Sequence, residues 1–572
     1  MKICHVSDPL SFQAQEAHPM GPQARVLLTS VFGPYAQDDE YGSRTVNPME
    51  CYHNQVTRVQ GPFSLRMTHP SLGLYLIMAN VDAPCTLLDF PDLNRFEQEL
   101  REKKYDIIGI SAKSPNVVKV AKMCAVIRAR QPGATIVVGG HIANMSDLGE
   151  RIDADYVVCG EGVRWFRKFL GQDPEQPISH PCVLSGTNAR CMGINLSDKS
   201  RDSAAALIPS VGCPIGCNFC STSAMFGGKG RFVCFYETGD ELFDVMCKIE
   251  KEMGVWSFFA MDENFLLNRR RSLRLLELIQ AHGKSWALYV FSSADVLASY
   301  DVEQLVGLGI SWVWVGLEGK NSHYEKLRGI DTQSLTRELQ ANGIRVLGST
   351  MIGLEEDSPD NIDEVIDWAV GHATDFHQFM LYTPAPGTPL YADYGQRGML
   401  LKESEVEWAD THGQSRFNYR HGRIQKGQDT EFLLTAFQRD FEANGPSVTR
   451  MMRTLLNGWL KYKNHPQAHI RKRFAMQVDK MPTLYAATLW ATRLWFKNNP
   501  PVAGKMAGLL NDIYNEFGMK SRIAAPLLGR IVLHLIRKEQ KRLDAGWAYE
   551  PPTFYVTSIK SVRPRGQFLQ KQ

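Results

Sequence analysis

Three cysteines stand close together near the middle of the chain. Cys213, Cys217 and Cys220 are separated by three residues and then by two. Thiolates spaced in this way within one loop can bind a common metal centre, either zinc or an iron–sulfur cluster. Three thiolates leave one iron of a four-iron, four-sulfur cluster free to bind a small molecule. A closed zinc site needs a fourth ligand, and Cys234 and Cys247 lack the paired spacing of such sites, so the cluster is favoured.

The bulk composition is that of an ordinary globular protein. The 572 residues are 44% hydrophobic and 22% charged, which predicts about three or four domains. The N-terminus has no signal-peptide pattern, and no apolar run approaches the roughly 18 residues of a spanning helix. The twelve cysteines all lie at or before Cys247 and are scattered outside the loop. No disulfide framework is indicated, and a reducing, cytoplasmic location is expected.

The net charge of +3 conceals an asymmetry. Residues 391–572 contain 29 Lys and Arg against 15 Asp and Glu, whereas the rest of the chain is acidic. A basic third either meets an anionic partner or is a solvated helical surface, and both interpretations stay open.

Residues 25–171 alternate between short apolar strands and helices, after an irregular segment, 1–24, to which no structure is assigned. Strands are expected at 25–32, 85–90, 105–111, 134–140 and 154–158, with helices at 72–80, 93–103 and 117–130. Nearly all-apolar strands between helices predict a parallel, doubly wound sheet that is covered on both faces.

Ligands of such sheets bind beyond the carboxyl ends of the strands. Polar residues and glycines follow three of the predicted strands, and glycine lets the backbone approach a ligand closely. The candidate binding residues at these turns are Ser111, Ala112, Ser114, Gly139, Gly140, His141, Gly160 and Glu161.

A second run of strands and helices spans residues 206–390, after a linker predicted at 172–205. The first strand, 206–211, delivers the cysteine loop, and five more are expected at 255–261, 286–293, 310–317, 344–352 and 376–382. Six parallel strand–helix units predict a partial barrel with its chemistry at the carboxyl strand ends.

The cysteine loop, with Phe219 before its last cysteine, resembles the signature of the radical S-adenosylmethionine (SAM) enzymes. The turns Asp106–Ser111, Val137–His141 and Gly160–Gly162 resemble those of the cobalamin-binding domain in the cobalamin-dependent members of that family. The D-x-H-x-x-G motif, by which other cobalamin proteins supply a histidine to cobalt, is missing. The resemblance therefore implies that His141 contacts the nucleotide tail or an outer position and does not ligate cobalt.

The same resemblance implies where SAM binds. Glu318 and Ser292 are placed to hold its amino acid and ribose portions, because a carboxylate suits an ammonium and a hydroxyl suits a ribose. A helix N-cap is the alternative role for serine, aspartate or asparagine after a strand. The full set of candidate SAM contacts is Phe219, Asp262, Glu263, Ser292, Glu318, Tyr382 and Pro384.

Residues 391–572 are predicted to be a basic, mainly helical domain. The stretches 484–497 and 526–541 mix large apolar residues with cations, which fits either helices at a membrane interface or helices in a packed core. Nucleic acid is a less favoured partner, since no RNA-binding module or aromatic–basic platform is present.

The family resemblance implies an enzyme that uses a four-iron cluster, SAM and cobalamin. Reductive cleavage of SAM gives a 5′-deoxyadenosyl radical that takes a hydrogen atom from the substrate, whose carbon then receives the methyl of methylcobalamin. The substrate is a small molecule, and the basic tail and the lipid-modifying hopanoid methylases favour a lipid. The electron donor would be a flavodoxin or ferredoxin. The alternatives are a cyclase or oxidase without methyl transfer, and a non-catalytic cobalamin or cluster sensor.

Overall fold

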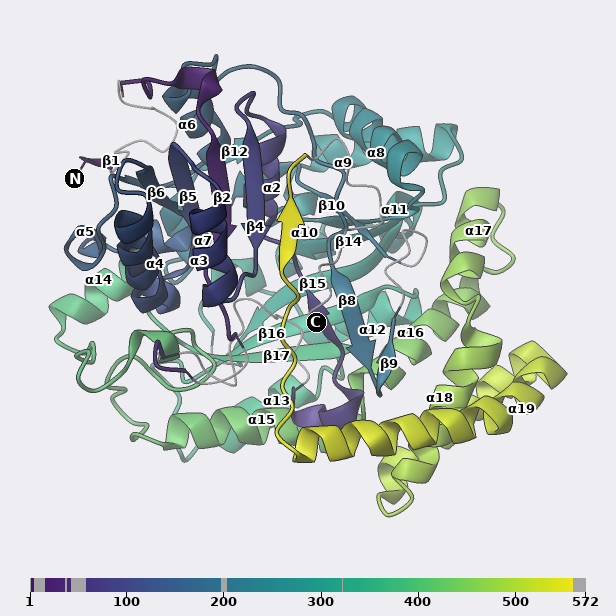
Figure 1. Ribbon diagram of the computed structural model, residues 1–572. Coiled ribbons are helices and arrows are strands. Elements are labelled where there is room, and N and C mark those ends of the chain that lie inside the picture. The colour runs from purple at the N-terminus through teal and green to yellow at the C-terminus, as the bar shows by residue number, and fades with distance from the viewer. Residues whose placement is uncertain are drawn as a thin grey trace.

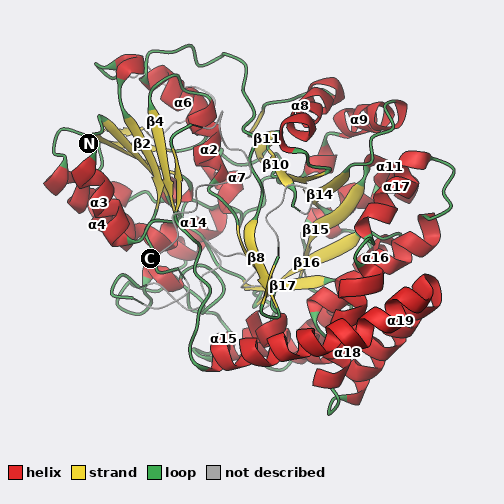
Figure 2. Ribbon diagram, turned by 45° about the vertical axis from the view of Figure 1, so that its right-hand side comes forward, coloured by secondary structure: helices red, strands yellow, loops and turns green. Residues whose placement is uncertain are grey.

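The computed structural model describes residues 2–4, 16–35, 39–42, 58–196, 203–320 and 322–558. Two α/β units, each built on a mainly parallel sheet, pack together above a layer of helices from the last third of the chain (Figure 1). Turning the molecule brings both sheets into view, with helices on their outer sides (Figure 2). The predicted class, two α/β units followed by a helical region, is confirmed.

The first sheet has seven strands in the order β1-β7-β6-β5-β2-β4-β18. Their bounds are β1 (Lys2–Cys4), β2 (Val26–Ser30), β4 (Cys85–Asp89), β5 (Ile107–Ser111), β6 (Thr135–Gly139), β7 (Tyr156–Val158) and β18 (Phe554–Val556). All pairs are parallel except β18 with β4. The two edge strands were not expected, because residues 1–24 were assigned no structure and residues 391–572 were predicted to be mainly helical.

Alternate residues of the central strands enter two hydrophobic layers, one on each face of the first sheet. Leu27 and Ile108 belong to one layer, whereas Leu28 and Ile107 belong to the other. Helices α2 (Leu72–Ala79), α3 (Leu93–Glu102), α4 (Val117–Arg130) and α6 (Gly162–Phe169) supply most of the opposing side chains. Burial on both faces explains why the strands read as continuous apolar runs.

The second sheet has six parallel strands in the order of the chain, β10-β13-β14-β15-β16-β17. Their bounds are β10 (Ala205–Leu207), β13 (Ser257–Ala260), β14 (Ala287–Ser292), β15 (Ile310–Glu318), β16 (Arg345–Ile352) and β17 (Phe376–Leu381). Helices α8 (Gly239–Met253), α9 (Arg269–Ala281), α11 (Val302–Leu308), α12 (Thr332–Ala341) and α13 (Ile362–Val370) connect them. This is the expected six-unit partial barrel.

The strand expected at 206–211 is two strands. β10 ends at Leu207, and β11 (Ser210–Gly212) turns away to pair antiparallel with β12 (Phe232–Cys234). Pro209 stands between them and has no backbone N–H to donate to a ladder. The segment 172–205, expected as a linker, also carries strands: β8 (Thr187–Cys191) and β9 (Ile194–Asn195) form a small antiparallel sheet with β3 (Arg66–Thr68).

Five helices make up most of the last third of the chain. They are α15 (Gln428–Asn444), α16 (Ser447–Tyr462), α17 (Ala468–Gln477), α18 (Ala486–Trp495) and α19 (Pro500–Asp544). The stretch 484–497 is largely core, since Ala487, Leu489 and Ala491 of α18 are fully buried. The stretch 526–541 lies in α19, and part of it is exposed. Within the described ranges, no helix combines the length and apolar character needed to cross a membrane.

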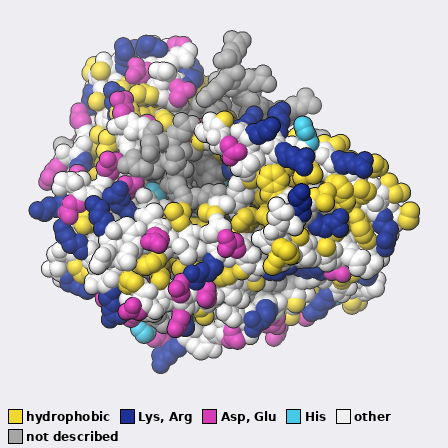
Figure 3. All heavy atoms as spheres, turned by 90° about the horizontal axis from the view of Figure 1, so that it is seen from below, with side chains coloured by type: hydrophobic (Ala, Val, Ile, Leu, Met, Phe, Trp, Pro, Cys, Tyr) yellow, Lys and Arg dark blue, Asp and Glu magenta, His cyan; other side chains and the backbone are white. Residues whose placement is uncertain are grey.

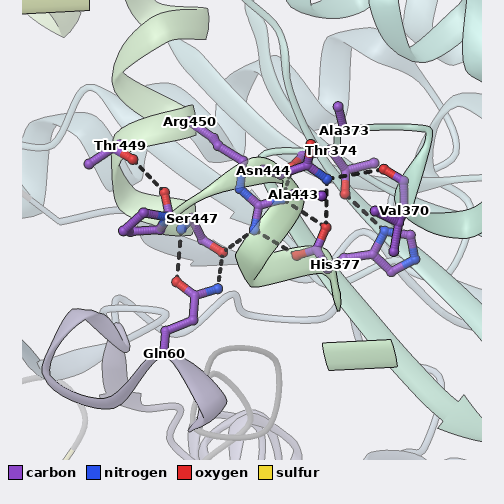
Figure 4. A network of polar contacts seen from close by, with 12 residues as sticks. Gln60, Val370, Ala373, Thr374, His377, Ala443, Asn444, Ser447, Thr449 and Arg450 are labelled. Carbon is purple, nitrogen blue, oxygen red and sulfur yellow. Dashed lines mark hydrogen bonds and ion pairs between the residues drawn. The ribbon is translucent and has the colours of Figure 1, made fainter. Parts of the chain in front are cut away.

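A polar network holds the helical region against the barrel (Figure 4). Gln60 exchanges two hydrogen bonds with Ser447 at the start of α16, at 2.6 and 2.8 Å. Arg450 donates to the backbone oxygen of Thr374, next to β17, at 2.7 Å and pairs with the buried carboxylate of Asp440 at 2.8 Å. These buried, charge-assisted bonds fix the helices relative to the last strand of the barrel.

Candidate active site

The cysteine loop lies between strand β11 and the short helix α7 (Ser221–Met225), at the carboxyl end of the barrel's first strand. Cys220 is the N-cap of α7, and its Sγ accepts from the backbone N–H of Ser223 at 3.5 Å. Gly212 and Gly216 take φ values of +86° and +72°, which glycine adopts without strain. The bends at these two glycines let the loop present three thiols within eight residues.

The loop has the chemistry of a cluster site. Burial raises the pKa of all three thiols, that of Cys213 to about 11, and bound iron reverses this by favouring thiolates. In the described part of the chain, no three His, Cys, Asp or Glu side chains already surround a single point as ligands of one ion would. The thiolates of a cluster each bind a different iron, so their ligand set is wider than that of a single ion. The residues present fit a cluster held by Cys213, Cys217 and Cys220.

Gly216 offers a test of this loop geometry. A Cβ at this position would lie 2.5 Å from the backbone Cα of Lys229, whereas one at Gly228, also at positive φ, would meet nothing within 4 Å. Gly216→Ala should therefore displace the loop and reduce the cluster absorbance after reconstitution severalfold, while Gly228→Ala costs only about 1 kcal/mol of backbone strain. Iron content and thermal unfolding would distinguish them. Equal cluster loading in both variants would contradict the proposed loop geometry.

Two tyrosines anchor the residues between the second and third cysteines. The hydroxyl of Tyr324 donates to Asn218 Oδ1 at 2.9 Å and lies 3.1 Å from the hydroxyl of Tyr382. The ring of Phe219 packs edge-on against Tyr324, with centroids 5.1 Å apart, and lies 6.4 Å from Tyr382. Phe219 and Tyr382, both predicted SAM contacts, are thus brought together at the loop. Pro384 lies just beyond, and its carbonyl accepts from Asn418 at 2.8 Å.

Glu318 ends strand β15 at a bulge, with φ +58°. Its carboxylate forms an ion pair with Lys326, and both side chains are largely buried. The Lys326 ammonium also lies 5.6 Å from the centre of the Phe219 ring. Burial opposes its charge, but Glu318 and Cys217 outweigh this effect and raise the pKa of Lys326. Glu318 therefore already holds an ammonium group, which is the chemistry expected of it toward SAM. No sequence pattern pointed to Lys326 or Tyr324.

Asp262 and Ser292, two further predicted SAM contacts, belong to a hydrogen-bonded row along the strand ends that includes Asn264. Asp262 pairs with Arg271 at 2.8 Å and accepts from Ser210 at 2.7 Å, so its carboxylate supports the fold at this edge. Ser292 donates to Asn264 Oδ1 at 3.0 Å. These internal partners give Asp262 a structural role and leave Ser292 at the carboxyl end of β14 with its hydroxyl bound to Asn264.

Glu263 faces a cavity beside the cysteine loop. Its Oε2 is buried and has no hydrogen-bond partner among the described residues. Burial raises the pKa of this carboxyl to about 8, so it is protonated at neutral pH. A buried carboxyl oxygen without a partner costs stability unless a ligand group completes it.

The proton on Glu263 predicts a pH dependence. The folded protein keeps this proton up to about pH 8, whereas the unfolded chain loses it above 4.5. The folded state binds more protons in that window, so its free energy of unfolding falls as pH rises, by up to about 5 kcal/mol. Glu263→Gln should abolish this fall, whereas Glu237→Gln, at an exposed position, should not. The free energy of unfolding would be measured by chemical unfolding of the cofactor-free protein at pH 5, 7 and 9. An unchanged slope in the Glu263 variant would refute the assignment.

The cavity has a volume of about 270 Å³ and lies at the carboxyl edge of the first sheet, facing α7. Most of the predicted cobalamin contacts line it: Ser111, Gly139, Gly140, His141, Gly160 and Glu161. A Cβ at Gly140 would lie 2.6 Å from the Ala112 carbonyl, so only glycine fits this turn. Glycine backbone and apolar walls suit a flat part of a large cofactor. The lining fits such a part of cobalamin.

Four of the predicted cobalamin contacts have identifiable partners or positions in the structure. His141 lies 3.0 Å from the Thr222 hydroxyl, and burial lowers its pKa to about 4, so the ring is neutral. Glu161 is the N-cap of α6 and accepts from the N–H groups of Val163 and Arg164, so its carboxylate is occupied. Ala112 pairs through its backbone with the β6 turn, and Ser114 is buried in the following turn; neither lines the cavity.

Three aromatic side chains form a wall on one face of the barrel sheet. Phe259, Phe291 and Trp314 come from three adjacent strands, with successive ring centroids 5.5 and 5.1 Å apart. These three side chains are partly exposed, although their strand neighbours, such as Ala260, Val290 and Val315, are buried. Alternate strand residues point to opposite faces, so the three partly exposed rings lie on the face of the second sheet opposite to α8, α9 and α11. On that face Trp314 also packs against the core cluster that includes Phe376 and Ile536.

Comparison with known proteins agrees with this arrangement. Residues 64–170 match the B12 binding domain. The chain is 22% identical over 311 residues to the bacteriochlorophyllide d C-12(1)-methyltransferase of Chlorobaculum tepidum, covering 51% of this chain and 66% of that protein. It is 23% identical over 221 residues to the hopanoid C-2 methylase of Rhodopseudomonas palustris, covering 36% and 41%.

A similar solved structure is the radical SAM methyltransferase TsrM of Kitasatospora setae, with cobalamin and a four-iron, four-sulfur cluster bound. It has a TM-score of 0.48 and 15% identity, over 80% of this chain and 99% of that one. The cysteine loop, the six-stranded partial barrel and the matched B12 binding domain make the chain similar to the cobalamin-dependent radical SAM enzymes.

Proposed function

We propose that this enzyme methylates an unactivated carbon of an apolar small molecule, and that its substrate is a lipid. The observation that carries the substrate class is the aromatic wall, because Phe259, Phe291 and Trp314 stay partly exposed on the inner face of the barrel sheet. Apolar surface in a concave site favours an apolar ligand. The relatives named for bacteriochlorophyllide and hopanoid methylation also support methyl transfer to a large apolar molecule.

When bound, the cluster and cobalamin supply one-electron cleavage of SAM and a transferable methyl group. The chain's own part is orientation. Cys213, Cys217 and Cys220 hold the cluster, and the Glu318–Lys326 pair offers both charges that the zwitterionic end of SAM requires. The aromatic wall holds the substrate and excludes water from the reacting carbon. An electron carrier such as a flavodoxin or ferredoxin completes the proposed system, which works at a membrane surface.

The test is an anaerobic reconstitution with iron, sulfide and cobalamin, followed by reduction with deuterated methyl-SAM in a cell lipid extract. Mass spectrometry of lipids and small molecules should find 5′-deoxyadenosine together with one deuterated methyl on a lipid. Phe291→Ala and Trp314→Ala should raise the substrate KM, while SAM cleavage without substrate continues. Cleavage without methyl incorporation would favour a cyclase or oxidase, and no cleavage in an iron-loaded sample would overturn the proposal.

A further inference from the structure

The second half of α19 carries an exposed row of apolar side chains. The helix breaks at Gly518 (φ +63°, ψ −144°), and a new helical run begins at Met519. Met519, Ile523, Leu527, Leu528 and Ile531 are 68, 53, 58, 41 and 58% exposed. Four of the five are spaced by four residues, so they share one helix face over about 18 Å. This set is called the apolar stripe.

The opposite face of the same helix is firmly packed. Ala525, Val532 and Ile536 are buried, and a Cβ at Gly529 would lie 2.5 Å from the Trp490 ring, so α19 rests closely on α18. Glu539 is buried and pairs with Arg190 of β8 at 2.5 Å. The apolar stripe is therefore the outer surface of a fixed helix.

Cations surround the apolar stripe. Residues 519–544 contain seven Lys or Arg against two Asp or Glu. Those whose side chains form no ion pair with any other described residue are Lys520, Arg522, Arg530, Arg537, Lys538 and Lys541. Seen from below, apolar side chains gather on the right of the molecule, with Lys and Arg among and around them (Figure 3). Large exposed apolar patches of this kind mark interaction surfaces.

We propose that the apolar stripe and its flanking cations dock this enzyme onto an anionic lipid bilayer. A second copy of the chain would bring like charges together at a shared stripe, which opposes association. A nucleic acid would meet the cations but leave five large apolar side chains in water. A bilayer with anionic headgroups can bind both the apolar stripe and the cations. The helix would lie in the interface plane with its cations toward the phosphates.

This inference deepens the proposed action on a lipid by naming the surface through which the enzyme reaches a bilayer. It involves none of the groups that hold the cluster, SAM or cobalamin. Docking and methyl transfer can therefore be tested separately.

The experiment is sedimentation of the full-length protein with phosphatidylcholine vesicles that contain or lack phosphatidylglycerol. The protein should bind the anionic vesicles and release them as salt rises. Ile523→Ser, Leu527→Ser and Ile531→Ser together should weaken this binding at least about tenfold. Lys520→Gln, Arg530→Gln and Lys538→Gln together should weaken it about a hundredfold.

The matched control is Val118→Ser with Leu434→Ser, since both residues are similarly exposed, at 45 and 41%, but lie on α4 and α15. The control should bind vesicles like the parent. All variants should keep the parent unfolding temperature and cleave SAM in detergent. Three results would overturn the proposal. The parent protein could fail to bind anionic vesicles, it could form a dimer that the stripe variant no longer forms, or it could bind RNA in place of lipid. Vesicle binding without methyl transfer to any lipid would count against the proposed function alone.

Discussion

Replacing Cys217 with alanine is expected to remove both iron and activity. A cluster needs all three thiolates of the loop, because each holds a different iron. The variant should lose the absorbance of the reconstituted cluster and cleave SAM at least about a hundredfold more slowly. Iron and sulfide analysis, together with 5′-deoxyadenosine formation under reducing conditions, would measure the effect.

Cys234 supplies the matched control. It is also partly buried, on strand β12 beside the loop, where its Sγ lies 3.4 Å from the Tyr236 carbonyl. Cys234→Ala should keep the cluster and the cleavage rate. If both variants lost iron equally, Cys234 would take part in the site, and the zinc-like alternative with four thiolates would return.

Breaking the Glu318–Lys326 ion pair is expected to impair both stability and SAM binding. Glu318→Gln leaves the Lys326 ammonium buried without its partner, which costs about 3 to 5 kcal/mol. The lost charge should also weaken SAM binding about ten- to a hundredfold, as removal of a charge-assisted hydrogen bond does. Chemical unfolding and equilibrium binding of SAM to the reconstituted protein would separate the two effects.

Two further variants distinguish SAM binding from folding. Glu318→Gln combined with Lys326→Met should recover much of the stability, because no charge remains buried alone, but not the SAM affinity. Glu539→Gln breaks another buried pair, with Arg190, and should destabilise the protein while leaving SAM affinity unchanged. SAM binding that followed stability across all variants would give Glu318 a purely structural role.

The parallel sheets were predictable because their strands are buried on both faces and read as short apolar runs. β5 and β16, for example, lie within one or two residues of the expected bounds. The break at Pro209 could not be predicted from the sequence. It depends on where the chain turns away from the sheet, which the pattern of apolar residues does not encode. The stretch 484–497 has the composition of both a core helix and an interface helix, and only the packing of Ala487 and Leu489 decided between them.

The site was predictable where one short stretch of sequence contains it. The cysteine loop is eight residues long and was found by its spacing. Lys326 was missed because its role depends on lying over Phe219, which is 107 residues away, and on an ion pair with Glu318 across an irregular loop that shows no pattern. Glu161 was expected to contact a ligand, but its position before α6 makes it a helix cap, a role open to a carboxylate at the end of any strand before a helix.

The strand β18 brings residues 554–556 back to β4, so both edges of the first sheet come from regions near opposite ends of the chain. During synthesis, β4 leaves the ribosome some 460 residues before its antiparallel neighbour. Until then its outer edge has unpaired backbone groups, which can join strands of another chain. The first sheet is thus complete only after residues 554–556 have emerged, which makes its maturation sensitive to chaperones and to early termination.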